Sequence, residues 1–160
     1  MNKLIGCKAA SAALLPQRWR EATADTAELR ALIALSAAVR DRRILAAVRA
    51  TALAKDRPAV VRGAAVTVLG SYVYPTLSGR VKQNRDGTIE VMVGPRTNPY
   101  QEEGLQPLGL DEQIEIDRVL NQLTSDFKSG DVPYLARGIL NTVRAACHDP
   151  KSRESVARCP

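Results

Sequence analysis

The chain has few of the residues that most catalytic and disulfide-rich proteins use. Its 160 residues include one histidine and three cysteines, and aromatic residues make up 4%. An odd cysteine count excludes complete pairing within the chain, and three cysteines are too few for a disulfide-dense scaffold. No apolar run approaches the roughly 18 residues that a membrane-spanning helix needs. We therefore expect a soluble body without a transmembrane segment.

The only histidine offers little support for catalysis or metal binding. His148 lies in a predicted turn beside Cys147 and Asp149, whereas a nucleophile and its base normally come from separate elements. A structural zinc site needs about four ligands, and Cys147, His148 and Cys159 supply three at most. No glycine spacing matches a phosphate-binding loop. The sequence predicts no enzyme, no catalytic or metal-binding residue, no cofactor and no small-molecule ligand.

Pairing of Cys147 with Cys159 stays open. If a helix joins them, about eight helical residues rise ~12 Å, which exceeds the ~7 Å between Cα atoms that a disulfide can bridge. The pair forms only if the chain bends back.

The apolar content favours helices packed on helices. Hydrophobic residues make up 45% of the chain, mostly as alanine, leucine and valine, whose small side chains allow close helix packing. The length fits one domain. The net charge is +6, and residues 1–75 carry 12 basic and 5 acidic groups. The positive charge of residues 1–75 favours binding of an acidic partner or nucleic acid. The alternative interpretation is a solvated helix surface that contains arginine because arginine is a good helix former.

Apolar stripes at helical spacing predict five helices. They begin after Asp25-Thr26, near Arg43, after Pro58, at Asp111 and before Leu135; the fourth includes Phe127 in its apolar stripe, and a short sixth helix covers 151–158. Residues 1–20, which contain Trp19, are expected to be a poorly ordered lead-in.

Residues 76–110 have a different pattern. Ile89, Val91 and Val93 alternate with Glu90 and Met92 after an Asp-Gly pair, and this period of two with a turn predicts a β-hairpin. The glycines and prolines of 94–110 predict a long loop.

One helical hairpin resembles a HEAT repeat. That pattern has an aspartate and a proline in the turn, then Val-Arg, a small residue and a leucine, and the matching residues are Asp56, Pro58, Val61, Arg62, Ala65 and Leu69. A second, shortened match is Asp149, Pro150 and Arg153. The resemblance covers residues 25–72 and 111–158.

The resemblance implies an all-α fold, a short α-solenoid of HEAT-like helical hairpins. The predicted β-hairpin and loop insertion at 76–110 departs from the family pattern and interrupts the stacking, so a smooth superhelix is not expected. One domain would cover residues 21–160, interrupted at 76–110. In this family Asp56 and Arg62 would hold adjacent turns together, which is a structural role. Stacking is also expected physically, because a lone helical hairpin cannot bury its apolar stripe.

This architecture favours a non-catalytic scaffold that binds another protein. The alternative is a HEAT-like protein that binds nucleic acid through a basic face. The residues predicted to bind in either case are Arg40, Arg42, Arg43, Arg49, Arg80, Lys82 and Arg85. Few aromatic residues lie among them, which argues against binding of single strands.

The first residues of the sequence bear on the cellular location of the protein. Leu4-Ile5-Gly6-Cys7 resembles the lipobox of a bacterial lipoprotein, but only three residues precede it, and an export signal needs an apolar stretch of about 7–15 residues. The default expectation is a cytoplasmic protein; an exported lipoprotein is the alternative if the true start lies upstream of Met1.

Overall fold

The chain is all-α. The computed structural model describes residues 8–39, 41–73, 81–83, 89–91, 110–149 and 159. Within them the helices are α2 (Lys8–Glu21), α3 (Thr26–Val39), α4 (Arg42–Leu53), α5 (Ala59–Val73), α6 (Leu110–Leu123) and α7 (Val132–His148). None of these helices is both long and apolar enough to cross a bilayer.

Two short strands interrupt the helices. Strand β1 (Val81–Gln83) pairs antiparallel with β2 (Ile89–Val91), and Val81 lies opposite Val91. The rest of the segment 76–109, including the predicted Asp-Gly turn, lies outside the described residues.

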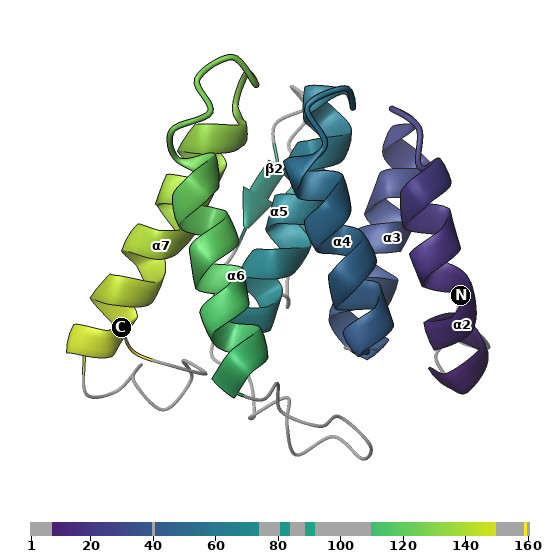
Figure 1. Cartoon of the computed structure of the whole chain (residues 1–160), viewed down its shortest axis with the longest axis horizontal. Coiled ribbons are helices and arrows are strands. Elements are labelled where there is room, and N and C mark those ends of the chain that lie inside the picture. The colour runs from purple at the N-terminus through teal and green to yellow at the C-terminus, as the bar shows by residue number, and fades with distance from the viewer. Residues whose placement is uncertain are drawn as a thin grey trace.

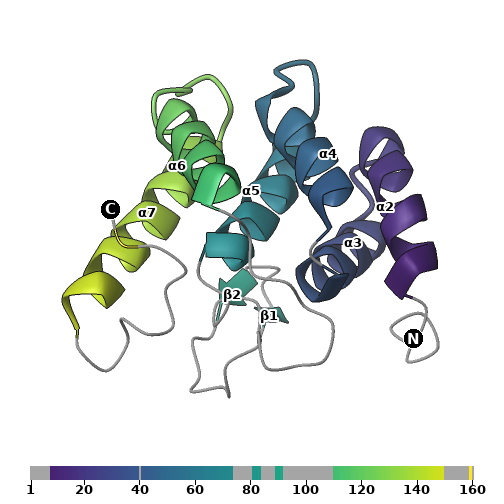
Figure 2. The ribbon, with the colours of Figure 1, turned by 60° about the horizontal axis from the view of Figure 1, so that its bottom comes forward.

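The helices form two layers. Helices α2, α4 and α6 pack side by side in one layer, and α3, α5 and α7 in the other, while α2 packs on α3, α4 on α5 and α6 on α7 (Figure 1). Figure 2 shows the same order of three helical hairpins from below. Helix α5 lies at the centre, because it contacts α3, α4, α6 and α7.

Aspartates start two of the helices. Asp25 Oδ1 accepts hydrogen bonds from the backbone N–H groups of Ala27 and Glu28 at 2.8 and 2.9 Å. Asp41 is the N-cap of α4 and accepts from the N–H of Arg43 at 2.8 Å. These bonds satisfy donors that the first helical turn leaves without partners.

Trp19 anchors α2 in the core. Its side chain is fully buried, and its Nε1–H donates to Ser36 Oγ on α3 at 2.8 Å. The Tyr72 hydroxyl of α5 donates to the Ser36 carbonyl at 3.0 Å. The expectation that residues 1–20 are a poorly ordered lead-in is therefore wrong for 8–20; residues 1–7 lie outside the described part.

Glycine permits close contact between the second and third hairpins. A Cβ placed on Gly70 of α5 would lie 2.7, 3.0 and 3.3 Å from three atoms of Ile139 on α7, whereas one placed on Gly138 would meet nothing within 4 Å. Ile139 is branched at Cβ and its χ1 is restricted, so its whole side chain would have to move.

We expect Gly70→Ala and Gly138→Ala to change stability in opposite directions. At Gly70 the overpacking costs about 1–3 kcal/mol, which exceeds the helix-propensity gain. At Gly138 the gain of about 0.5–1 kcal/mol remains alone. Urea denaturation followed by circular dichroism measures both. A stabilised Gly70→Ala protein would contradict the close contact with Ile139.

Candidate interaction surface

An arginine in the α4–α5 turn joins the second hairpin to the first. The Arg57 guanidinium donates to the carbonyls of Trp19, Arg20 and Ala22 at 3.4, 3.0 and 2.7 Å. These carbonyls lie at the end of α2 and just beyond it, where the last turn of a helix leaves acceptors unpaired. A cation there also interacts favourably with the helix dipole.

A second arginine joins the second hairpin to the third. Arg62 on α5 is 2% exposed and donates to the Ala52 carbonyl at 2.9 Å and to Asp126 Oδ2 at 2.7 Å. It also donates to Ser129 Oγ, whose hydroxyl in turn donates to Asp126 Oδ2 at 2.7 Å. We call Arg62, Asp126 and Ser129 the inter-hairpin link.

The carboxylate of the link is Asp126 of the α6–α7 turn. Asp56, which the HEAT resemblance pairs in role with Arg62, is exposed. The hydrogen bond from Arg62, followed by that from Ser129, lowers the pKa of Asp126 below its ordinary value of 3.8. Asp126 is therefore charged at neutral pH, and the pair is hydrogen-bonded as a buried arginine requires.

A further copy of the turn motif lies ahead of the residues 149–153 that the HEAT resemblance matched. Residues 56–68 and 131–143 share six of thirteen positions, with the pattern Asp-x-Pro-x-x-x-Arg-Gly-x-x-x-Thr-Val. In both copies the threonine hydroxyl donates to the carbonyl of the preceding glycine, Thr67 to Gly63 at 3.0 Å and Thr142 to Gly138 at 2.8 Å. The two copies are 75 residues apart in the sequence and lie on either side of the insertion.

Of the residues that the resemblance matched in its second copy, Asp149 is the C-cap of α7. Pro150 and Arg153 lie outside the described residues, as does the predicted helix over 151–158.

The two copies differ in what covers them. Arg62 is buried in the link, whereas Arg137, at the same position of the repeat, is exposed. Val66 and Leu69 of α5 are buried, whereas their counterparts Asn141 and Arg144 on α7 are exposed. The face of α7 that carries Arg137, Asn141 and Arg144 is therefore exposed, whereas the equivalent face of α5 is buried.

The predicted basic cluster is placed among carboxylates. Arg42 pairs with Glu112 of α6 at 2.5 Å, Arg49 with Glu115 of α6 at 3.3 Å, and Arg43 with Asp41 at 3.0 Å. The hydrogen bond from Arg43 is the main cause of a lowered pKa at Asp41. The structure thus uses Arg42 and Arg49 to join α4 to α6.

The remaining predicted binding residues are not placed together. Arg40, Arg80 and Arg85 lie outside the described residues, and only the backbone of Lys82 is described, in β1.

Three exposed large apolar side chains lie in or next to the α4–α5 and α6–α7 turns, and Figure 1 draws both turns at the upper end of the helices. Phe127 is 67%, Tyr134 65% and Val60 48% exposed. Gly130 brings the turns together, because a Cβ built on it would lie 3.5 Å from the Ala59 Cβ. We call Val60, Phe127 and Tyr134 the turn-end patch.

Phe127 does not belong to the apolar stripe of α6, as its spacing predicted. Helix α6 ends at Leu123, and the N–H of Asp126 then bonds the Leu123 carbonyl at 3.1 Å in a tight turn. The helical register is lost before Phe127, so its ring points away from the core. The helical periodicity of the sequence thus concealed the exposure of this phenylalanine.

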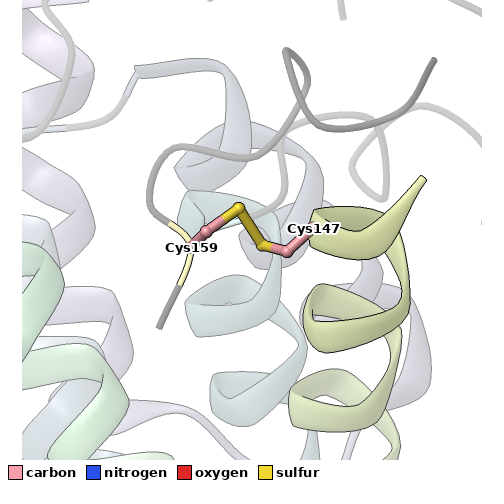
Figure 3. The surroundings of a disulfide bond; sticks show 2 residues. All are labelled: Cys147 and Cys159. Atoms are coloured by element: carbon pink, nitrogen blue, oxygen red, sulfur yellow. A yellow bond between two sulfur atoms is a disulfide. The ribbon is translucent and has the colours of Figure 1, made fainter. Parts of the chain in front are cut away.

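The C-terminal cysteines form a disulfide. Cys147 at the end of α7 is bonded to Cys159, with 5.5 Å between their Cα atoms (Figure 3). The disulfide removes the thiols, and His148 is exposed. In the described part of the chain no three His, Cys, Asp or Glu side chains could together hold a metal ion.

No protein-family model, curated protein or solved structure matches the chain.

Proposed function

We propose that the chain is a non-catalytic helical-repeat scaffold of the HEAT-like type that binds another protein through the turn-end patch. The observation that carries the proposal is the exposure of Phe127 and Tyr134 on either side of one turn. Isolated surface apolar residues are ordinary, but two exposed aromatic rings and a valine at one end form the kind of mixed patch that marks protein interaction sites. Aromatic residues are also enriched in such interfaces.

The layered hairpins support this role. The inter-hairpin link and the Arg57 bonds fix the turns relative to one another, so that Val60 and Tyr134 are presented on helices whose positions are set by buried contacts. A rigid presentation lowers the ordering cost of binding. The β-hairpin insertion and the solenoid arrangement are part of the same proposal, with β1 and β2 as its support.

Nucleic-acid binding is the less favoured function. Arg42 and Arg49 already pair with carboxylates of α6, which reduces the positive potential available to phosphates. Fluorescence anisotropy with a labelled DNA duplex at about 50 and 200 mM salt tests this alternative, because multi-phosphate contacts weaken steeply over that range.

Site-specific photo-crosslinking tests the proposed patch. The photoreactive analogue p-benzoylphenylalanine replaces Phe127, or Leu14 of α2 as the control position, since Leu14 is also a large exposed apolar residue. In a lysate of the source organism we expect one polypeptide to be crosslinked from position 127 and not from position 14. Tyr134→Ser should abolish the product, while Val39→Ala, away from the patch, should not.

Two outcomes oppose the proposal. Equal crosslinking from both positions would mean that no specific protein recognises the patch. Micromolar binding to the DNA duplex that collapses at higher salt, without a specific crosslink, would favour the nucleic-acid function instead.

A further inference from the structure

The turn-end patch has charges of both signs around it. Lys55 and Asp56 of the α4–α5 turn are exposed, and so are Lys128 and Asp131 of the α6–α7 turn. We call these four residues the rim charges. Two of them are basic and two are acidic, so they cancel, although the chain as a whole has a net charge of +6.

The other charges at this end of the molecule do not change that balance. Arg57 donates to three backbone carbonyls, and Asp126 is held in the inter-hairpin link. The α2–α3 turn, which Arg57 joins to this end, also exposes both signs, with Arg20, Glu21 and Asp25. An anionic membrane or a nucleic acid is attracted by an excess of positive charge. The balanced end therefore favours a partner that presents both signs beside an apolar patch.

A second copy of the chain presents such a surface. Copies that each have a net charge of +6 repel one another in general. Because the rim charges cancel, this end is where two copies can approach with little of that repulsion. The same patch then serves both copies in a two-fold symmetric contact, which is the commonest arrangement of homo-oligomers.

We propose that the partner of the turn-end patch is a second copy of the chain, paired so that the α6–α7 turn of each copy lies on the α4–α5 turn of the other. The rings of Phe127 and Tyr134 then lie against Pro58, Ala59 and Val60 of the other copy, all of which are exposed. This pairing rests on the proposed function, because it uses the same patch and names its partner.

The pairing also matches the rim charges. Each of the two turns carries one exposed lysine and one exposed aspartate. Lys128 of one copy therefore lies opposite Asp56 of the other, and Asp131 lies opposite Lys55. Two-fold symmetry repeats both pairs, so that no contact between like charges is required.

The size of the patch predicts a weak dimer. Two aromatic rings of ~200 Å² each, about two-thirds exposed, offer roughly 270 Å² per copy. A standard protein interface buries about 800 Å² on each partner. We therefore expect a dissociation constant of about 0.1–1 mM, as for a transient contact.

Sedimentation equilibrium of the purified full-length protein tests the pairing. Between about 10 µM and 1 mM, a range set by the expected dissociation constant, the weight-average mass should rise from the 17.3 kDa of one chain towards twice that value and no further. A single-chain mass throughout would overturn the proposal. A mass that exceeds two chains would overturn it as well, because a two-fold contact closes after one partner.

Charge reversal identifies the two turns. Asp56→Lys alone and Lys128→Asp alone should each weaken the dimer by about tenfold, because symmetry turns two attractive pairs of exposed charges into two repulsive ones. An equal mixture of the two variants should form a 1:1 dimer about as tightly as the parent, since both pairs are then opposite in sign. A mixture no tighter than either variant alone would exclude this pairing of the turns.

Two matched controls separate the contact from net charge. Asp111→Lys and Arg144→Asp make the same changes in net charge at exposed residues outside the two turns. Each should dimerise like the parent. Weakening equal to that of Asp56→Lys and Lys128→Asp would mean that the turns are not the contact.

Crosslinking separates a failure of the dimer from a failure of the proposed function. With p-benzoylphenylalanine in place of Phe127, the purified protein should give a product of two chain masses. If it gives none while the lysate gives a product with a different polypeptide, the second copy is overturned and the patch keeps its proposed role. If neither sample gives a specific product, both proposals are overturned.

Discussion

Replacing Arg62 with alanine is expected to destabilise the protein by about 3–5 kcal/mol, the range found when one partner of a buried ion pair is removed. Arg62 is 2% exposed and is the shared partner of Ala52, Asp126 and Ser129. Its loss leaves the Ala52 carbonyl without its side-chain donor, leaves Asp126 with the Ser129 hydroxyl but without its cation, and opens space between the second and third hairpins. Urea denaturation followed by circular dichroism measures the change in the free energy of unfolding.

Arg137→Ala is the matched control. The residue has the same position in the 75-residue repeat and is exposed, so its substitution should change stability by no more than about 0.5 kcal/mol. Similar losses from both substitutions would mean that the loss at Arg62 does not come from the buried inter-hairpin link.

The pH dependence of the free energy of unfolding provides a second test of the inter-hairpin link. The folded-state pKa of Asp126 is lowered by Arg62, so the link stabilises the fold above the ordinary pKa of 3.8. This contribution is lost as the pH falls from there through the lowered value. In the Arg62→Ala protein, that part of the acid destabilisation should be absent.

Replacing Trp19 with alanine should cost about 3–5 kcal/mol, as for other large aromatic side chains removed from a core. The ring is fully buried, and its loss also removes the bond to Ser36. Because Trp19 is the only tryptophan, thermal unfolding must be followed by circular dichroism at 222 nm.

Leu14→Ala, on the same helix and exposed, is the control and should be nearly neutral. A Trp19→Ala protein as stable as the Leu14→Ala protein would show that α2 does not belong to the cooperative core. In the parent protein, the fluorescence of Trp19 should change together with the circular dichroism signal if the three hairpins unfold as one unit.

The helices from α3 onward could be predicted from local signals. Asp25 and Asp41 precede apolar residues at helical spacing, and the structure uses both as caps. Helix α2 was missed because Pro16 lies inside it, and an internal proline is normally a sign that a helix ends. Its order depends on Trp19 reaching Ser36, 17 residues later, which no local pattern contains.

The surface was less predictable than the fold. The arginines at 42 and 49 form a basic cluster in the sequence, but their carboxylate partners lie on α6, beyond the insertion. A straight helix from Cys147 would place Cys159 too far away for a disulfide, yet their Cα atoms lie 5.5 Å apart. In each case the deciding contact joins residues that only the tertiary fold brings together.

The contacts of Arg57 and Arg62 close very different lengths of chain, and this predicts the order in which the three hairpins associate during folding. Arg57 reaches back 35 residues to Ala22, whereas Arg62 reaches forward 64 residues to Asp126. Closing a loop nearly twice as long costs roughly 0.6 kcal/mol more in chain entropy, and distant contacts form later in general. The first two hairpins should therefore associate early in folding, and the third should dock last, on an Arg62 already held by the Ala52 carbonyl.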